Sequence, residues 1–270
     1  MRDLATKVAV ITGAANGLGR ALALCLYKQH FNLALLDIDI DGLTKLQREL
    51  SNNTQAISIH QVDVSNEEQI IAARKEILQR HQHVDILINN AGVSISQPFD
   101  QLALDDYKWL FDINFWGTVY CCKHFLPDLQ EQPGSRLVNI ISDFALMGFP
   151  GKTSYASSKA AVMGFSNALY TELNGTNVKL SIVIPPALDT NIVKNGKHID
   201  EIKRTKEAEF LQKNGMSLDK AATRIISKVK AGKYRVVIGS MMFWTDLGSR
   251  LFPTWIHKLI WKNKKKFRFV

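Results

Sequence analysis

The sequence predicts an α/β fold in a single domain, in which helices cover both faces of a parallel sheet. Short, continuously apolar runs alternate with longer segments of helical composition, as is typical of parallel strands buried between two layers of helices. Of the 270 residues, 46% are hydrophobic and 22% are charged, which suits a globular protein with a large core. No repeat, low-complexity block or linker rich in glycine and proline divides the chain, so one domain is expected.

The first half of the chain is expected to contain four strands, because its apolar runs are rich in β-branched residues or leucine and end at polar residues or glycines. These strands are residues 7–12, 32–37, 56–63 and 84–89. The segments between them contain good helix formers and are expected to be helices, at 18–27, 41–49 and 66–80.

The second half repeats this alternation, with strands expected at 136–142, 178–184 and 234–238 and helices at 104–129, 154–173 and 217–231. The first of these helices is expected to stop near Pro127 and Pro133, because proline interrupts helical hydrogen bonding. Residues 191–216 are polar and have no strand pattern, so we expect a mobile lid there. The charged side chains of this lid, Glu207 among them, are expected on a solvated helix face.

Composition and cysteine content exclude several classes of protein. No stretch reaches the roughly 18 uncharged apolar residues that a membrane-spanning helix needs. The short segment before the first strand leaves no room for a signal peptide, so none is expected. Cys25, Cys121 and Cys122 do not form a disulfide framework in a chain of this length, so we expect buried free thiols and a cytoplasmic location. No metal site is expected.

A glycine-rich turn, Thr12-Gly-Ala-Ala-Asn-Gly-Leu-Gly19, joins the first strand to the first helix. The start of a helix offers free N–H groups and the positive end of its dipole, and a pyrophosphate fits there if the main chain is bare. The glycines therefore favour a dinucleotide site, although glycines in such turns also serve packing alone. The expected contacts in this turn are Gly13, Asn16, Gly17, Leu18 and Gly19.

An acidic residue, Asp37, ends the second strand 18 residues after Gly19, where a carboxylate can bind both ribose hydroxyls of an adenosine. This carboxylate would repel a 2′-phosphate, and the next residue is Ile38 rather than an arginine that would attract one. We therefore expect NAD(H) to be favoured over NADP(H). The alternative is a solvated acid at a strand end.

Tyr155 and Lys159 lie four residues apart in a helical stretch, so their side chains share one face. A neighbouring ammonium favours the phenolate, and a tyrosine whose pKa is lowered in this way can accept a hydroxyl proton while hydride leaves the adjacent carbon. Ser142 ends the preceding strand, from which its hydroxyl could hold the substrate oxygen. The spacing alone also occurs in exposed helical pairs, so it does not establish a site.

Together, these motifs resemble the short-chain dehydrogenase/reductase family: the glycine turn, Asn89-Asn-Ala-Gly92, Asn114, Ser142 and the Tyr155–Lys159 pair. The resemblance covers roughly residues 5 to 240 and follows the family's order and spacing. It implies a doubly wound Rossmann fold with a seven-stranded parallel sheet and a nicotinamide site at the carboxyl ends of the strands. It also implies homodimers or homotetramers that form through the helices at 104–129 and 154–173.

The resemblance implies a role for each matching residue. Tyr155 would be the general acid/base, Lys159 would lower the pKa of Tyr155 and bind the nicotinamide ribose, and Ser142 would orient the substrate oxygen. Asn114 would kink its helix and hold a proton-relay water. The implied cofactor contacts outside the glycine turn are Asp37, Asp63, Val64, Asn90, Ala91, Gly92, Tyr155, Lys159, Pro185, Leu188 and Thr190.

Two residues depart from the family pattern. Pro186 follows Pro185 where family members usually have glycine, which removes an N–H group and fixes φ near the expected carboxamide. Asp143 follows Ser142 where a small residue is common. An acid there either adds polarity to the substrate site or faces solvent, and we expect the second.

The substrate side is expected to be apolar, because Phe144, Met147 and Phe149 follow Ser142 closely. With Ser142 and Tyr155, Phe144 and Phe149 are the expected substrate contacts. The predicted activity is hydride transfer between NAD(H) and a lipophilic secondary alcohol or ketone. The alternatives are an NADP(H)-dependent carbonyl reductase of the same family and a catalytically silent NAD(H)-binding sensor or scaffold, which would need no acid/base pair.

The end of the chain, residues 244–270, is set apart from the expected catalytic domain at 1–243 because it combines aromatic residues with seven basic residues and one acid, Asp246. One interpretation is a helix, broken at Pro253, that lies on an anionic membrane surface. The other is that the aromatic residues pack on the body or on a neighbouring subunit. Nucleic-acid binding is not expected, because no nucleic-acid motif accompanies the charge.

Overall fold

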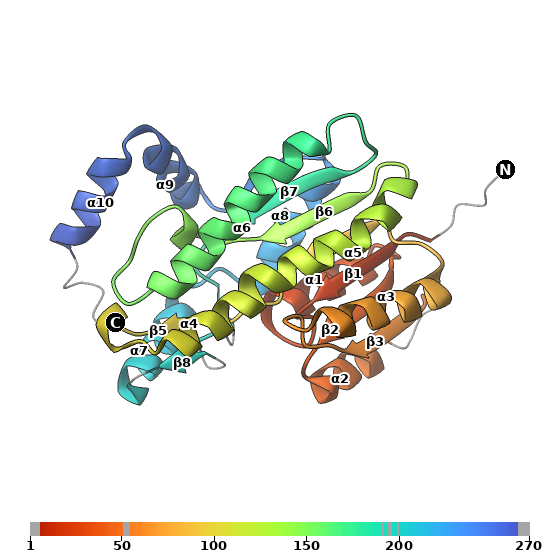
Figure 1. Cartoon of the computed structure of the whole chain (residues 1–270), viewed down its shortest axis with the longest axis horizontal. Helices are drawn as coiled ribbons and strands as arrows, with labels where there is room; N and C mark the ends of the chain where they lie inside the picture. Colours follow the sequence, from red (N-terminus) through yellow and green to blue (C-terminus); the bar gives the residue numbers. More distant parts are fainter. Residues whose placement is uncertain are drawn as a thin grey trace.

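A seven-stranded parallel sheet forms the centre of the protein, as the sequence predicts (Figure 1). The computed structural model describes residues 6–50, 55–188, 190, 192–193, 196–198 and 200–263. The strand order is β3-β2-β1-β4-β6-β7-β9. The strands are β1 (Val8–Thr12), β2 (Asn32–Asp37), β3 (Ile57–Gln61), β4 (Ile86–Asn89), β6 (Arg136–Ile140), β7 (Lys179–Ile184) and β9 (Arg235–Val237).

The sheet is doubly wound, because the chain moves from β1 outward to β3 and then returns to place β4 on the other side of β1. Each face of the sheet has its own core, since neighbouring residues of a strand point in opposite directions. Ala9 and Ile11 belong to the core beneath α1 (Gly17–Tyr27), α2 (Ile40–Leu50) and α8 (Leu218–Lys230). Val10 belongs to the core beneath α3 (Glu67–His81), α5 (Gly117–Glu131) and α6 (Thr153–Glu172).

The helix expected at 104–129 is longer than predicted. It consists of α4 (Leu104–Phe111), a π-helical turn (Asp112–Trp116) and α5, which continues through Pro127 to Glu131. It passes Pro127 and ends before Pro133, which agrees with the expected stop near these two prolines. The helix continues past Pro127 because the next two residues are anchored: both guanidinium donors of Arg74 bind the carboxylate of Asp128 at 2.6 Å, and Leu129 is fully buried.

The segments around the carboxyl ends of the strands contain elements that periodicity did not reveal. β5 (Ile95–Ser96) pairs in parallel with β8 (Lys197–His198), and α7 (Glu201–Asn214) follows in the segment expected to be a lid. The lid prediction also included positions 191, 194, 195 and 199, which lie outside the described residues. A 3-10 turn (Phe99–Gln101) precedes α4, and another (Asp143–Ala145) follows β6.

Two helices end the described chain, α9 (Ser240–Leu251) and α10 (Pro253–Lys262). They lie together on the side opposite the N-terminus (Figure 1). Pro253 is the first residue of α10, where its missing N–H costs nothing, so it starts a new helix as well as ending the previous one. The expected free thiols are confirmed, although only Cys121 and Cys122 are buried and Cys25 is half-buried.

Candidate active site

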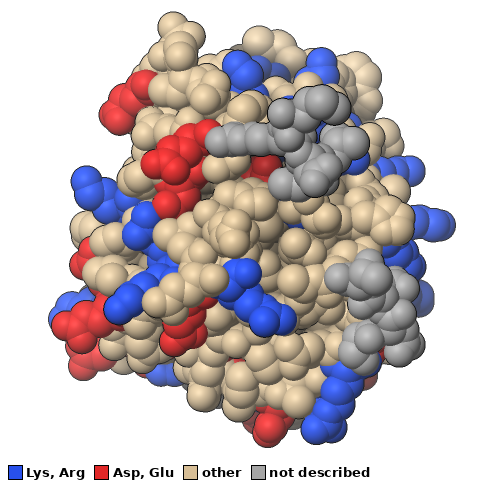
Figure 2. Space-filling model, turned by 90° about the vertical axis from the view of Figure 1, so that its right-hand side faces the viewer, with Lys and Arg blue, Asp and Glu red and all other residues tan. Residues whose placement is uncertain are grey.

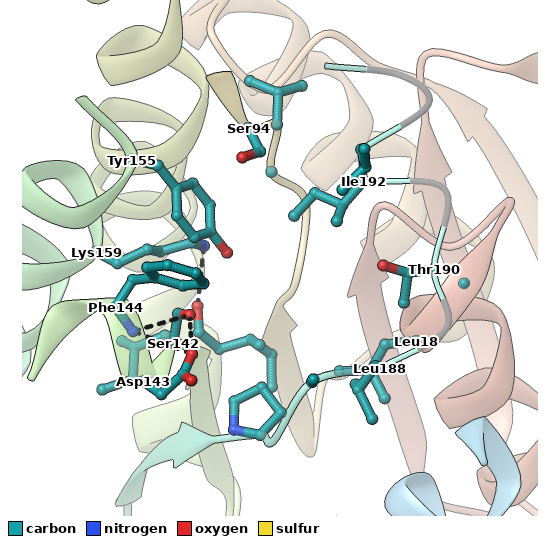
Figure 3. Close-up of a pocket in the computed structure, with 18 of the residues that line it drawn as sticks. Leu18, Ser94, Ser142, Asp143, Phe144, Tyr155, Lys159, Leu188, Thr190 and Ile192 are labelled. Carbon is teal, nitrogen blue, oxygen red and sulfur yellow. Dashed lines mark hydrogen bonds between the residues drawn. The ribbon is translucent and has the colours of Figure 1, made fainter. Parts of the chain in front are cut away.

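A large pocket lies at the carboxyl ends of the central strands, with a volume of about 1090 Å³. It extends from the turn after β1 and the end of β2 to Ser142, Tyr155 and Lys159. Its position agrees with the rule that doubly wound sheets bind ligands where the strand order reverses, here between β1 and β4. Figure 3 shows Leu18, Leu188 and Thr190 on one side of this pocket and Ser142, Tyr155 and Lys159 on the other.

The turn after β1 presents bare main chain to the pocket. Gly13 and Gly17 have φ angles of 64° and 54°, a conformation that L side chains rarely adopt. A Cβ atom on Gly13 would lie 2.8 Å from Cα of Ala91. No side chain caps the start of α1, so its first N–H groups are available to an anion. These features fit the pyrophosphate of a dinucleotide.

Gly19 does not line the pocket, although the sequence suggested a cofactor contact. A Cβ atom on Gly19 would lie 2.0 Å from the carbonyl oxygen of Gly13 and 2.6 Å from Nδ2 of Asn90. Asn90 donates hydrogen bonds to the carbonyl oxygens of Thr12 and Gly13, at 3.0 and 3.1 Å. Gly19 therefore supports the turn without contacting the cofactor. Only glycine at this position allows α1 to pack so close to the main chain of Gly13.

Replacing Gly19 by alanine should destabilise the protein, because the new Cβ atom would collide with main chain that cannot move independently. We expect the free energy of unfolding to fall by at least about 1–3 kcal/mol. Gly164 is a matched control, since it lies on the exposed side of α6 and a Cβ atom there meets nothing within 4 Å. Gly164→Ala should raise the same free energy by about 0.5–1 kcal/mol. Urea unfolding curves check both values, and changes of the same sign would contradict this account of Gly19.

The carboxylate of Asp37 stands at the other end of this turn and lines the pocket. Its two oxygens accept hydrogen bonds from the N–H groups of Ala15 and Asp39, at 2.9 and 3.0 Å. A carboxylate can accept further bonds from both oxygens, so Asp37 can hold the turn and bind two hydroxyls together. The pocket wall also contains these predicted cofactor residues: Asn16, Asp63, Val64, Asn90, Ala91, Gly92, Pro185, Leu188 and Thr190.

Helix α6 and the end of β6 bring three predicted catalytic residues together. Tyr155 and Lys159 are one helical turn apart and buried, and their side chains converge beside Ser142 (Figure 3). The ammonium of Lys159 donates to the carbonyl oxygen of Ile140 at 3.1 Å, which fixes its position below the tyrosine. Ser142 hydrogen-bonds with Tyr155 and donates to Oδ1 of Asp143 at 2.9 Å.

The protein side chains alone raise the pKa of Tyr155, because burial penalises the phenolate more than the hydrogen bond with Ser142 favours it. The nearby carboxylates of Asp143 and Glu207 raise this pKa further. Burial also lowers the pKa of Lys159 to about 8. That the ammonium of Lys159 lowers the pKa of Tyr155 stays a prediction, because the raised pKa results from burial and from the two carboxylates.

Asn114 lies behind the pocket wall rather than on it. It belongs to the π-helical turn between α4 and α5 and is fully buried. Its side chain accepts from the N–H of Val93 at 2.8 Å and donates to the carbonyl oxygen of Val93 at 2.9 Å. A Cβ atom on Gly92 would lie 3.1 Å from Oδ1 of Asn114 and 3.3 Å from Nζ of Lys159. Asn114 thus fixes the loop that separates it from Lys159.

Asp143 lines the pocket, so the expectation that it faces solvent is wrong. The 3-10 turn that follows β6 directs its carboxylate back toward Ser142, where Oδ1 also accepts the N–H of Phe144 at 3.0 Å. Burial raises the pKa of Asp143. The single proton of the Ser142 hydroxyl can go to Asp143 or to a substrate oxygen, so Asp143 competes with the substrate for it.

Phe144 and Phe149 form the apolar wall that the sequence predicts. Their ring centroids are 4.9 Å apart, and Phe144 also contacts the ring of Tyr155 at 5.7 Å. Met147, Ile192 and Phe210 also line the pocket. Pro185 and Pro186 are both on the pocket wall, so the departure at Pro186 affects the site directly.

A buried ion pair between Lys152 and Glu207 was missed by sequence reasoning. Nζ of Lys152 lies 2.6 Å from Oε1 of Glu207, and the two side chains are 2% and 7% exposed. Lys152 also donates to the hydroxyls of Ser94 and Ser96, and Ser96 donates to Glu207 at 2.7 Å. Glu207 was expected on a solvated face, but α7 turns it inward against Lys152, the residue just before α6. Both side chains line the pocket.

The fold and this pocket define a class of protein: a Rossmann-fold oxidoreductase with a dinucleotide site at the strand ends. The family model for short chain dehydrogenases matches residues 7–200. SadH of Mycobacterium tuberculosis is 33% identical over 271 residues, which cover 99% of this chain and 98% of that protein. The chain therefore belongs to the short-chain dehydrogenase/reductase family.

Two solved structures extend the comparison to the cofactor. A short chain dehydrogenase/reductase from Burkholderia phymatum, in complex with NAD, is 25% identical with a TM-score of 0.83, over 93% of this chain and 94% of that one. An alcohol dehydrogenase from Thermococcus sibiricus, complexed with 5-hydroxy-NADP, is 26% identical with a TM-score of 0.76, over 88% and 97%. Similar proteins thus include complexes with both kinds of dinucleotide.

Within the described residues, no helix is long and apolar enough to cross a bilayer, and no group of potential ligands could hold a metal ion.

Proposed function

We propose that this protein transfers hydride between NAD(H) and a lipophilic secondary alcohol or ketone. The observation that carries the proposal is the convergence of Ser142, Tyr155 and Lys159 on one wall of a pocket whose other end is bounded by Asp37 and bare main chain. A pocket lined by Phe144 and Phe149 beside these polar groups suits a substrate with one reacting oxygen on an apolar body.

In the direction of oxidation, the phenolate of Tyr155 accepts the proton of the substrate hydroxyl as the carbinol C–H bond breaks. A dinucleotide held by the turn after β1, Asp37 and Lys159 would take up the hydride in that direction and supply it in the other. The Ser142 hydroxyl donates a hydrogen bond to the substrate oxygen and holds this oxygen within reach of Tyr155. Lys159 lies one turn away on the same helix, where its ammonium stabilises the phenolate. The amine of Lys159 keeps this charge at pH values below its pKa of about 8.

A screen of secondary alcohols and ketones of increasing apolar size, followed at the absorbance of NADH, tests the proposed reaction. We expect turnover to increase with the apolar surface of the substrate. Turnover that is equal with small, polar alcohols would contradict the lipophilic preference. Binding of NADH without turnover of any alcohol or ketone would favour the alternative of a silent sensor.

The preference for NAD(H) rests on Asp37. We expect isothermal titration to give tighter binding of NADH than of NADPH, and Asp37→Ser to weaken NADH binding by about tenfold to a hundredfold, the range for hydrogen bonds to a charged group. The same change should leave NADPH binding equal or tighter, because it removes a repulsive carboxylate. Asp41→Ser, at an exposed position of α2, is the matched control. Tighter binding of NADPH to the unaltered protein would show that the enzyme is an NADP(H)-dependent reductase instead.

A further inference from the structure

Helices α9 and α10 present an apolar surface that the rest of the described protein does not cover. Half of the large hydrophobic side chains that are exposed in the described residues lie on these two helices or at Phe252 between them. They are Met241, Phe243, Trp244, Leu251, Phe252, Trp255, Leu259 and Trp261, which we call the tail patch. Patches of this kind mark surfaces that bind another protein or a membrane.

Helix α10 packs on α9 with one side and leaves the apolar residues of its other side exposed. Ile256 is buried, and a Cβ atom on Gly248 of α9 would lie 3.1 Å from it, so this side of α10 packs on α9. On the outer side, Phe252, Trp255 and Leu259 follow the helical spacing of one stripe. Trp255 remains 62% exposed, which is unusual for a tryptophan with no partner to cover it.

The charge of the same helices is positive. Asp246 is the one acid of α9 and α10, and it is buried in ion pairs with Arg235 and Arg250. The exposed Lys258 and Lys262 are therefore not balanced by an acid on these helices. The sequence continues with Lys264, Lys265, Lys266 and Arg268, which lie outside the described residues. By contrast, Figure 2 shows basic and acidic side chains intermixed on the side of the molecule where the N-terminus lies in Figure 1.

We propose that α9 and α10 dock on an anionic lipid bilayer, with the tail patch inserted among the acyl chains and the lysines against the headgroups. Tryptophan favours the membrane interface because its ring is apolar and its N–H remains hydrated. Lysines on the same helix are attracted by anionic lipids and repelled by a second copy of the same surface. This charge favours a bilayer over a subunit partner as the occupant of the patch.

The proposed orientation places the pocket against the bilayer. Four residues of α9 and α10 also line the pocket wall: Met241, Thr245, Leu259 and Ile260. Met241 and Leu259 are also exposed, so the tail patch is continuous with the edge of the pocket. A lipophilic ligand that is dissolved in the bilayer would thus reach the pocket without crossing water, a consequence that rests on the proposed function.

Flotation of the full-length protein with vesicles tests the docking directly and needs no catalysis. We expect the protein to float with vesicles of phosphatidylcholine and phosphatidylserine, and to do so far less with phosphatidylcholine alone. Trp255→Ser combined with Trp261→Ser should reduce binding at least about tenfold. Lys258→Glu with Lys262→Glu should reduce it by a similar factor on the anionic vesicles, since each cation near such a surface contributes on the order of fivefold.

Matched variants control for nonspecific effects. Trp116→Ser removes an exposed tryptophan elsewhere, and Lys45→Glu with Lys75→Glu changes charge on α2 and α3, so both should float normally. Tyr155→Phe should also float normally, which separates this proposal from the proposed function. Failure of the unaltered protein to bind anionic vesicles would overturn the proposal. So would light scattering that shows an oligomer in the unaltered protein and a monomer in the double tryptophan variant, because the patch would then be a subunit interface.

Discussion

Tyr155→Phe should reduce turnover of the preferred alcohol by about 10²–10⁴-fold, the range for loss of a general acid or base. The phenolic oxygen is the only atom removed, and the ring can keep its contact with Phe144 at 5.7 Å between centroids. The fold and the dinucleotide end of the pocket should therefore be unchanged. The loss should appear in kcat more than in KM, because the group acts on the reacting proton.

Tyr107→Phe is the matched control for this prediction. Its hydroxyl hydrogen-bonds to that of Ser157 at 2.6 Å, so the change removes one phenolic hydroxyl near the same helix without touching the proposed proton path. We expect turnover of this variant to remain within about twofold of the unaltered protein, while its stability falls by about 1 kcal/mol. Turnover of Tyr155→Phe as high as that of Tyr107→Phe would contradict the role assigned to Tyr155.

Much of the site could be predicted because its residues are placed by local pattern. Parallel strands must end at the same edge of the sheet, so Asp37 and Ser142, each near the end of an apolar run, were expected to face one pocket. The helical repeat likewise placed Tyr155 and Lys159 on one face. These predictions needed only the periodicity of the elements and the order of motifs along the chain.

The errors arose where burial depends on the path of a loop. Nothing in the sequence next to Asp143 reveals that a 3-10 turn directs its carboxylate toward Ser142. Glu207 lies in a helix with no apolar stripe, and its partner Lys152 precedes it by 55 positions, so neither residue signals the other. The pKa of Tyr155 is raised because the surrounding chain excludes solvent from its hydroxyl. The sequence does not reveal how complete this burial is.

The pair of Lys152 and Glu207 should have the largest effect on stability of any ion pair described here. Burial lowers the pKa of Lys152 even though Glu207 opposes the shift, so desolvation is expensive at this position. Removing one partner leaves the other charge buried, and we expect Lys152→Met to lower the free energy of unfolding by about 3–5 kcal/mol. Lys152→Met combined with Glu207→Met should recover most of that loss, because the double change leaves no buried charge on either residue.

An exposed pair gives the comparison that isolates burial as the cause. Lys108 and Asp105 lie 3.5 Å apart with side chains that are 74% and 95% exposed, so Lys108→Met should change stability by less than about 0.5 kcal/mol. Urea unfolding of the single and double variants measures all three values. If Lys152→Met were no more damaging than Lys108→Met, α7 would not be held against α6 by this pair. Hydrogen exchange of residues 201–214 provides a second readout, since exchange there should accelerate in Lys152→Met, and slow again in the double variant, if the ion pair holds α7 in place.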